Sequence, residues 1–158
     1  MKIGRTDEAK PILIECQEHF LECENLSGLS YTHLSFGEFH LLEGALAEAL
    51  THLIDCYLIR DSINHYSRND EILDFLGETL LKIGRDADSL LAFALAENLR
   101  IANSFSLETK NRVKIDGFIQ CCKDNLKDES TIEIWSQGIN LGLKEIPGVL
   151  QRFKTITL

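Results

Sequence analysis

The residue types and spacing best suited to chemistry occur in the stretch Arg60-Asp-Ser-Ile-Asn-His65. An arginine guanidinium can neutralise a phosphate, and a histidine can abstract or donate the 2′-hydroxyl proton that metal-independent RNA cleavage requires. Arg60 and His65 are therefore the candidate catalytic pair. A structural interpretation competes with this one, because cations near the end of a helix are favoured by the negative end of its dipole.

Whether this pair can act together depends on where the preceding helix ends. If the helix continued to His65, the two side chains would lie about one and a half turns apart, on nearly opposite faces. Catalysis therefore requires a break near Asp61, whereas the structural interpretation accepts either geometry. Because a long helix gives way to a polar loop here, we expect the Arg60 and His65 side chains to reach solvent without sharing a basic pocket.

Carboxylates and histidines at helical spacing form a second candidate constellation. Three pairs have this spacing: Glu15 with His19, Glu18 with Glu22, and His40 with Glu43. Di-iron bundles use a Glu-x-x-His motif on two helices, and no pair here has that order. No C-x-x-C pair is present to suggest a zinc ribbon. We therefore predict no metal site and no cofactor, and interpret these side chains as solvated helix faces.

The cysteines do not form a disulfide framework. Their number is odd, and two of them are adjacent: Cys16, Cys23, Cys56, Cys121 and Cys122. We interpret them as free thiols that act mainly as small hydrophobic side chains. Since successive helical residues point about 100° apart, at most one of Cys121 and Cys122 can face a core squarely.

The longest element predicted by periodicity begins at Ser35. Ser35 and Glu38 have the spacing of a capping box, and apolar residues then recur at steps of three and four, which places them on one helix face. We predict one helix from Ser35 to about Ile59, roughly 36 Å long at 1.5 Å per residue. Other helices must pack along an element of this length.

The remaining segments show the same periodicity. Helices are predicted over Asp7 to Gly28, from Asn69 or Asp70 to Gly84, over Asp86 to Ala102 and Ser106 to Leu126, from Ser130 through Ile139, and over Gly148 to Phe153. A polar connection is expected at Ser30 to His33 and a loop at Asp61 to Arg68, while the tail Lys154 to Leu158 has strand-like composition without a partner strand. We expect one all-α domain over residues 1–158, an antiparallel bundle of five to six helices.

The core of this bundle is predicted from the apolar stripe of each helix. We expect Leu46, Leu53, Leu91, Leu95 and Phe118 to belong to it. Asn98 and Asn103 lie in a helix that is apolar on more than half of its circumference, so each needs a hydrogen-bond partner. Those partners could lie at a helix–helix contact, a subunit interface or a ligand pocket.

Composition limits the classes of partner. Hydrophobic residues make up 44% of the 158 residues and charged residues 26%, as in an ordinary soluble domain. The net charge of -9 disfavours binding to phosphate backbones, and we expect no DNA partner. No apolar run approaches the ~18 residues that span a membrane, and no signal-peptide core follows the first residues. We therefore expect a cytoplasmic protein without a membrane partner.

The spacing of Arg60 and His65 resembles the R-x4–6-H signature of the HEPN superfamily, small helical domains of prokaryotic ribonuclease toxins and nucleotide-linked antitoxin systems. Asp61 matches the polar residue that commonly follows the arginine in that family. The resemblance implies a helical-bundle fold and, in active members, metal-independent cleavage of RNA.

The order of elements is similar to that of the PaREP1-type members. A first amphipathic helix is followed by a long Ala-rich one, here Gly44-Ala-Leu-Ala-Glu-Ala-Leu50, then by a His-containing loop and further helices. The segment from Ala96 to Phe105 is similar to the late helix that carries the catalytic motif in active members. The resemblance extends over roughly Asp7 to Leu126.

Two classes of function follow. The first is a non-catalytic, HEPN-like binding module that dimerises and holds a nucleotide, RNA or protein partner. The second is a metal-independent endoribonuclease that uses Arg60 and His65. Net charge favours the first, and so does the place of the motif, which active members carry near the last core helix. Arg100, at the position that would match, has Ser104, Phe105 and Ser106 where a histidine would stand.

A homodimer is expected from the helix that begins at Ser130. This helix and the residues after it carry Trp135, Ile139, Leu143 and Ile146 beyond what a five-helix core needs. An exposed apolar stripe of this kind marks an interface, unless the helix packs back on its own bundle.

Overall fold

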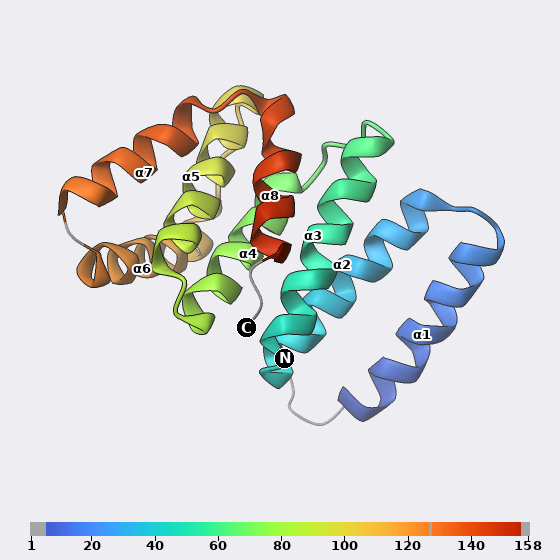
Figure 1. Ribbon diagram of the computed structural model, residues 1–158. Helices are drawn as coiled ribbons and strands as arrows, with labels where there is room; N and C mark the ends of the chain where they lie inside the picture. The colour runs from blue at the N-terminus through green and yellow to red at the C-terminus, as the bar shows by residue number, and fades with distance from the viewer. Residues whose placement is uncertain (1–5, 127, 156–158) are drawn as a thin grey trace. The chain divides into compact units, whose positions relative to one another are not determined.

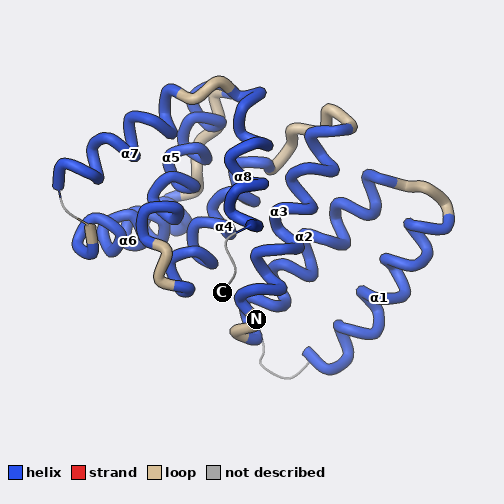
Figure 2. Tube along the Cα trace, viewed as in Figure 1, coloured by secondary structure: helices blue, strands red, loops and turns tan. Residues whose placement is uncertain are grey.

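The computed structural model describes residues 6–126 and 128–155, which form eight α-helices and one short 3-10 turn and contain no strand (Figures 1 and 2). The chain divides into two compact units, the first ending at Ser67 and the second beginning at Arg68. The all-α fold class predicted from the sequence is confirmed. Eight helices form instead of five or six, mainly because the longest predicted helix is divided.

The first unit contains three consecutive helices. They are α1 (Thr6–Glu22), α2 (Leu26–Glu43) and α3 (Leu46–Ser62), and α2 packs against both of its neighbours. Close approach of α2 and α3 depends on Gly37, where an added Cβ would lie 2.6 Å from the Leu53 side chain. Leu53 is fully buried at this contact.

The prediction of one helix from Ser35 to Ile59 is wrong, because the chain turns at Gly44. Gly44 adopts a left-handed conformation with φ of 78°, which glycine reaches without the steric cost that other residues meet. The N–H of Ala45 donates to the His40 carbonyl at 2.9 Å and closes α2. The apolar period therefore continues across a turn between two packed helices.

The start of α2 also differs from the prediction. Asn25 caps this helix by accepting a hydrogen bond from the Gly28 N–H at 2.8 Å. The expected capping box at Ser35 and Glu38 and the expected connection at Ser30 to His33 both lie inside the helix. An Asx cap placed before an apolar run explains this earlier start.

The second unit is built around α5. Its elements are α4 (Asn69–Ile83), α5 (Asp86–Asn103), α6 (Thr109–Asn125), α7 (Asp128–Asn140), the 3-10 turn η1 (Leu143–Glu145) and α8 (Ile146–Thr155). Helices α4, α6 and α7 all pack against α5, in which every residue from Leu90 to Ala96 is buried. The predicted starts of α4 and α5 are confirmed, and Gly84 ends α4 as expected.

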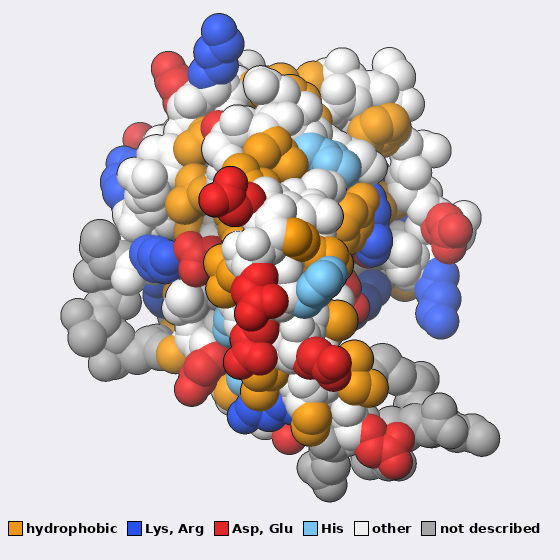
Figure 3. Space-filling model, turned by 90° about the vertical axis from the view of Figure 1, so that its right-hand side faces the viewer, with side chains coloured by type: hydrophobic (Ala, Val, Ile, Leu, Met, Phe, Trp, Pro, Cys, Tyr) orange, Lys and Arg blue, Asp and Glu red, His pale blue; other side chains and the backbone are white. Residues whose placement is uncertain are grey.

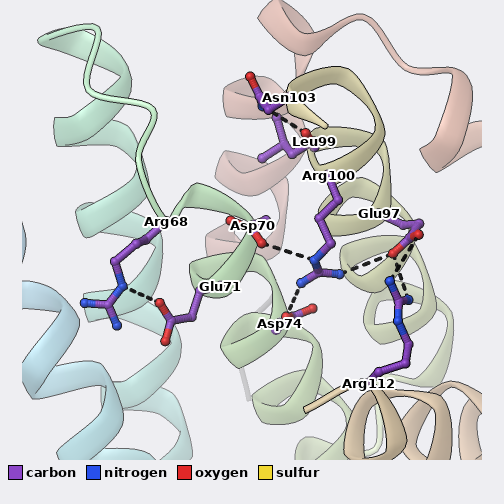
Figure 4. A network of polar contacts seen from close by, with 9 residues as sticks. All are labelled: Arg68, Asp70, Glu71, Asp74, Glu97, Leu99, Arg100, Asn103 and Arg112. Atoms are coloured by element: carbon purple, nitrogen blue, oxygen red, sulfur yellow. Dashed lines mark hydrogen bonds and ion pairs between the residues drawn. The ribbon is translucent and has the colours of Figure 1, made fainter. Parts of the chain in front are cut away.

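A network of charges ties α4, α5 and α6 together (Figure 4). Arg100 of α5 is 2% exposed; it donates to Asp70 at 3.1 Å and forms a short contact with Asp74, both on α4. Glu97 accepts from Arg112 of α6 at 3.0 Å. Burial raises the pKa of Asp74 to about 7, against the opposing charge of Arg100. Arg100 is thus a structural ion-pair partner within the second unit.

Helix α7 packs on its own unit, so the apolar stripe expected to be exposed is covered in part: Trp135 and Ile139 are partly buried and Ile146 is buried, whereas Leu143 is 42% exposed. The amide nitrogen of Asn98 donates to the carbonyls of Gly138 at 3.1 Å and Leu141 at 2.8 Å. A Cβ at Gly138 would lie 2.5 Å from that of Ala94, and Ile146 is fully buried. Asn98 therefore marks a helix–helix contact, one of the three predicted alternatives, and most of the stripe from which the homodimer was predicted packs within the unit.

Several boundaries and faces differ from the predictions. Helix α6 begins at Thr109 instead of Ser106, and Val113 on this helix is 69% exposed. Helix α7 begins at Asp128, before the predicted start at Ser130. Lys154 and Thr155 continue α8, and the last three residues lie outside the described part of the chain.

The core prediction is confirmed in part. Leu53, Leu91 and Leu95 are buried, whereas Leu46 and Phe118 are partly buried. The described cysteines are all free; Cys56 and Cys122 are buried, and Cys23 and Cys121 are exposed. Within the described residues, no helix combines the length and apolar character needed to cross a bilayer.

Candidate functional site

Arg60 and His65 lie where α3 ends. The helix stops at Ser62, so the break near Asp61 that catalysis would require is present, and the backbone N–H of His65 donates to the Arg60 carbonyl at 2.8 Å. The following loop folds back along the last turn of the helix and brings the Ser67 carbonyl to the arginine side chain.

The prediction that Arg60 reaches solvent is wrong, since its side chain is 0% exposed. Its Nη1 donates to the Ser67 carbonyl oxygen at 2.5 Å, and its Cζ lies 4.6 Å from the centre of the Tyr31 ring. Nε and Nη2 are buried without a hydrogen-bond partner. Within residues 6–126 and 128–155, no carboxylate forms an ion pair with this guanidinium.

His65 remains partly exposed and contacts the same tyrosine. Its ring lies 6.0 Å from the Tyr31 ring in an edge-on arrangement, with an angle of 81° between the planes. Tyr31 itself is 42% exposed. Sequence spacing could not identify Tyr31, because it lies on α2 and faces the end of α3 only once the chain has turned at Gly44.

This arrangement limits what Arg60 can do chemically. A phosphate-binding guanidinium must present its N–H groups to the ligand, whereas this guanidinium is covered by Tyr31 and bonded to the backbone. In the conformation described here, Arg60 supports the end of α3, and His65 is the member of the pair that solvent reaches.

A cluster of histidines lies between α2 and α3. The Nδ1 atoms of His33 and His52 are 3.0 Å apart, so one ring donates and the other accepts. The His52 ring stacks on Phe36 at 4.9 Å and on His40 at 5.5 Å. Burial and the neighbouring His33 and His40 lower the pKa of His52 to about 4. The neutral form of His52 is therefore favoured in this cluster.

The described residues contain no group of three or more His, Cys, Asp or Glu side chains that could hold a metal ion. Of the pairs singled out in the sequence, Glu15, Glu18, His40 and Glu43 instead line an open groove. His19 and Glu22 are not part of its lining.

This groove, which we call the acidic groove, has a volume of about 870 Å³ and lies within the first unit. It is lined by Lys10, Pro11, Ile14, Glu15, Glu18, Phe39, His40, Glu43, Ala45 and Glu48. Figure 3 faces the α1 side of the molecule, where acidic side chains gather with hydrophobic ones between them. The groove thus combines negative charge with an apolar lining.

The uneven distribution of charge along the sequence could have indicated this acidic surface. Residues 1–67 contain 11 acidic and 4 basic residues, whereas residues 68–158 contain 14 acidic and 12 basic residues. The net charge of -9 therefore falls mostly on the first part of the chain. One of its four cations, Arg60, is buried, and another, Lys10, lies in the groove itself.

Comparison with models of known protein families, with curated proteins and with solved structures found no match to this chain. Its function is therefore inferred from the geometry and charge of its side chains.

Proposed function

We propose that the protein is a non-catalytic helical binding module whose binding surface lies on the first unit. The burial of Arg60 is the observation that carries this proposal. A guanidinium that is 0% exposed, bonded to the Ser67 carbonyl and covered by Tyr31 acts within the fold and does not face a substrate. The R-x4-H spacing then reflects how α3 ends.

Charge favours a protein partner over a nucleotide or RNA. Nucleic-acid binding needs cations that face the phosphates. In the first unit, Arg60 is buried, and Lys10 shares the acidic groove with four carboxylates. A partner of positive charge meets a favourable potential on this surface, whereas a polyanion meets a repulsive one.

The second candidate is the metal-independent endoribonuclease. It is favoured by one observation, that the Arg60 and His65 side chains both contact the Tyr31 ring. Cleavage by this pair would require Tyr31 to move and Arg60 to leave the Ser67 carbonyl, so that a phosphate could be reached.

The test is incubation of the purified protein with single-stranded RNA in the presence of EDTA. We expect the RNA to remain intact, at the same level as with the His65→Ala variant. His19→Ala is the matched control, because His19 is an exposed histidine on α1 outside the candidate pair. Cleavage by the wild type and by His19→Ala, lost in His65→Ala, would establish the ribonuclease instead.

The homodimer and the HEPN-like relationship stay predictions. The helix that motivated the dimer packs partly within its own unit, so a dimer would use the exposed Ile132 and Leu143 of this region, or other exposed apolar side chains such as Ile101, Phe105 and Val113. Light scattering at high protein concentration distinguishes a monomer from a dimer.

A further inference from the structure

The acidic groove contains carboxylates that have no ion-pair partner among the described residues. Glu15 and Glu18 of α1 face the groove together with Glu43 and Glu48, which flank the turn between α2 and α3. None of the four forms an ion pair with a lysine, arginine or histidine of the described chain. Four negative charges that converge without partners create a potential that favours a cation.

The positive groups in the groove offset little of this charge. Among the residues that the structure describes, Lys10 is the only lysine or arginine in its lining. Burial lowers the pKa of His40, against the opposing effect of Glu48 and Glu43, so its imidazole stays neutral at neutral pH. The groove therefore keeps a negative charge under ordinary solution conditions.

The lining is also apolar in part, which distinguishes the groove from a solvated acidic surface. Pro11 and Ile14 of α1 face it, together with Phe39 of α2 and Ala45 at the turn. Ile14 is 42% exposed there. When a partner covers apolar surface that was in contact with water, the free energy of binding becomes more favourable in proportion to the area buried.

The size of the groove accommodates an occupant much larger than a metal ion. A volume of about 870 Å³ is large enough for several side chains. A linear polyamine would pair with the carboxylates but would leave the apolar lining in water. A peptide segment that carries lysine or arginine beside aliphatic side chains satisfies both parts of the lining.

We infer that the acidic groove is a docking site for a basic amphipathic peptide segment of a partner protein. Such a segment would lay its apolar side chains against Ile14 and Phe39 and direct its cations to the surrounding carboxylates, as an amphipathic helix does in a groove. This inference rests on the proposed binding function and identifies the chemistry of the partner.

The experiment measures binding of a fluorescent synthetic peptide, built from lysine and leucine at helical spacing over about four turns. Fluorescence anisotropy is recorded at several salt concentrations. A peptide with glutamate in place of lysine provides the charge control, and spermine added as a competitor tests whether charge alone accounts for binding. We expect binding of the lysine peptide only, weakened by salt, and incomplete displacement by spermine.

Two pairs of variants locate the binding on the protein. Glu18→Lys and Ile14→Ser change the charge and the apolar lining of the groove, and each should weaken binding about tenfold. Glu22→Lys and Ile12→Ser make the same changes at exposed positions of α1 outside the groove and should leave the affinity unchanged. Circular dichroism of each variant verifies that the helices are retained.

Several outcomes would overturn the inference. Absence of binding, equal loss in the groove variants and their controls, or full displacement by spermine with no effect of Ile14→Ser would each contradict a peptide site. These outcomes leave the non-catalytic module in place as long as RNA stays intact. Conversely, peptide binding with the expected variant pattern, together with His65-dependent RNA cleavage, would refute the proposed function and retain the groove.

Discussion

Arg60 is a buried cation held by a carbonyl oxygen and an aromatic ring, and no carboxylate in the described part of the chain pairs with it. Two of its nitrogens lack hydrogen-bond partners. Burial of a charge without such partners costs free energy, so the volume of the side chain and its contact with Tyr31 contribute more to stability than its charge does. Arg60 therefore has a packing role in the fold, which does not depend on any catalytic role.

The prediction at this residue compares two substitutions. Arg60→Met keeps most of the buried volume and removes the unpaired charge, whereas Arg60→Ala leaves a cavity. We expect the alanine variant to be less stable than the methionine variant by about 2–5 kcal/mol in urea unfolding. Equal destabilisation by both substitutions would mean that the charge, and not the packing, is what the fold requires.

Protonation of His52 makes the stability of the fold depend on pH. Its pKa is about 4 in the folded protein against an ordinary value of 6.5, because burial, His33 and His40 all disfavour its charged form. The carboxylates that face it, Asp55 and Glu48, oppose this shift without reversing it. Between pH 4 and pH 6.5, the folded state therefore binds fewer protons at His52 than the unfolded state does.

The stabilising contribution of neutral His52 is fully present above pH 6.5 and is lost as the pH falls towards 4. We expect the free energy of unfolding to decrease over this interval. His52→Gln keeps a hydrogen-bonding side chain opposite His33 but cannot titrate, so it should reduce the decrease. Thermal unfolding followed by circular dichroism across this pH range provides the measurement, and an unchanged pH profile in the variant would contradict this assignment.

At the scale of elements, the turn at Gly44 determines the structure of the first unit. It separates α2 from α3 and lets the two helices pack side by side, which places Tyr31 over the end of α3. It also brings Glu43, Ala45 and Glu48 to the acidic groove. Both the candidate catalytic pair and the groove thus depend on one residue with a positive φ.

Gly44→Ala tests this turn. An added Cβ would meet no atom within 4 Å, so the cost should come from the left-handed backbone alone, about 1–2 kcal/mol. Gly117→Ala is the matched control, because this glycine lies inside α6 with equally open space and no positive φ. There the same change should stabilise the protein by about 0.5–1 kcal/mol. If chemical denaturation showed that both substitutions change the free energy of unfolding in the same direction, this account would be contradicted.

The sequence predicted individual helices better than their connections. Local signals located α4 and α5, where Gly84 and the apolar runs agree with the packing. The turn at Gly44 was missed because apolar residues recur at the same spacing on both sides of it. Leu42, which belongs to that pattern, is in fact exposed.

The candidate site was predicted only in part, because some of its contacts come from other helices. The place of Arg60 and His65 at the end of a helix follows from local sequence. The burial of Arg60 does not, because the covering ring comes from Tyr31 on another helix and the accepting carbonyl from Ser67. Contacts between elements that are distant in sequence depend on the turn at Gly44, which periodicity alone did not reveal.

At the scale of the whole molecule, charge is divided unequally along the chain. The first 67 residues hold 11 acidic and 4 basic residues, whereas the following residues are nearly balanced. In the second unit, carboxylates such as Asp70, Asp74 and Glu97 are paired with arginines between helices. In the first unit, the carboxylates of the acidic groove have no such partners among residues 6–67. The two units therefore use acidic residues differently, one for internal packing and the other for its surface.

The most direct test of this account is a residue-resolved NMR titration of the full chain, first with the lysine–leucine peptide and then with single-stranded RNA. We predict that the peptide shifts the amide signals of the acidic groove, including those of Ile14, Glu18 and Glu48, and that RNA leaves the signals from Arg60 to His65 unchanged. RNA-dependent shifts at Arg60 and His65, with the groove unaffected by the peptide, would contradict the central claim that this protein is a non-catalytic binding module.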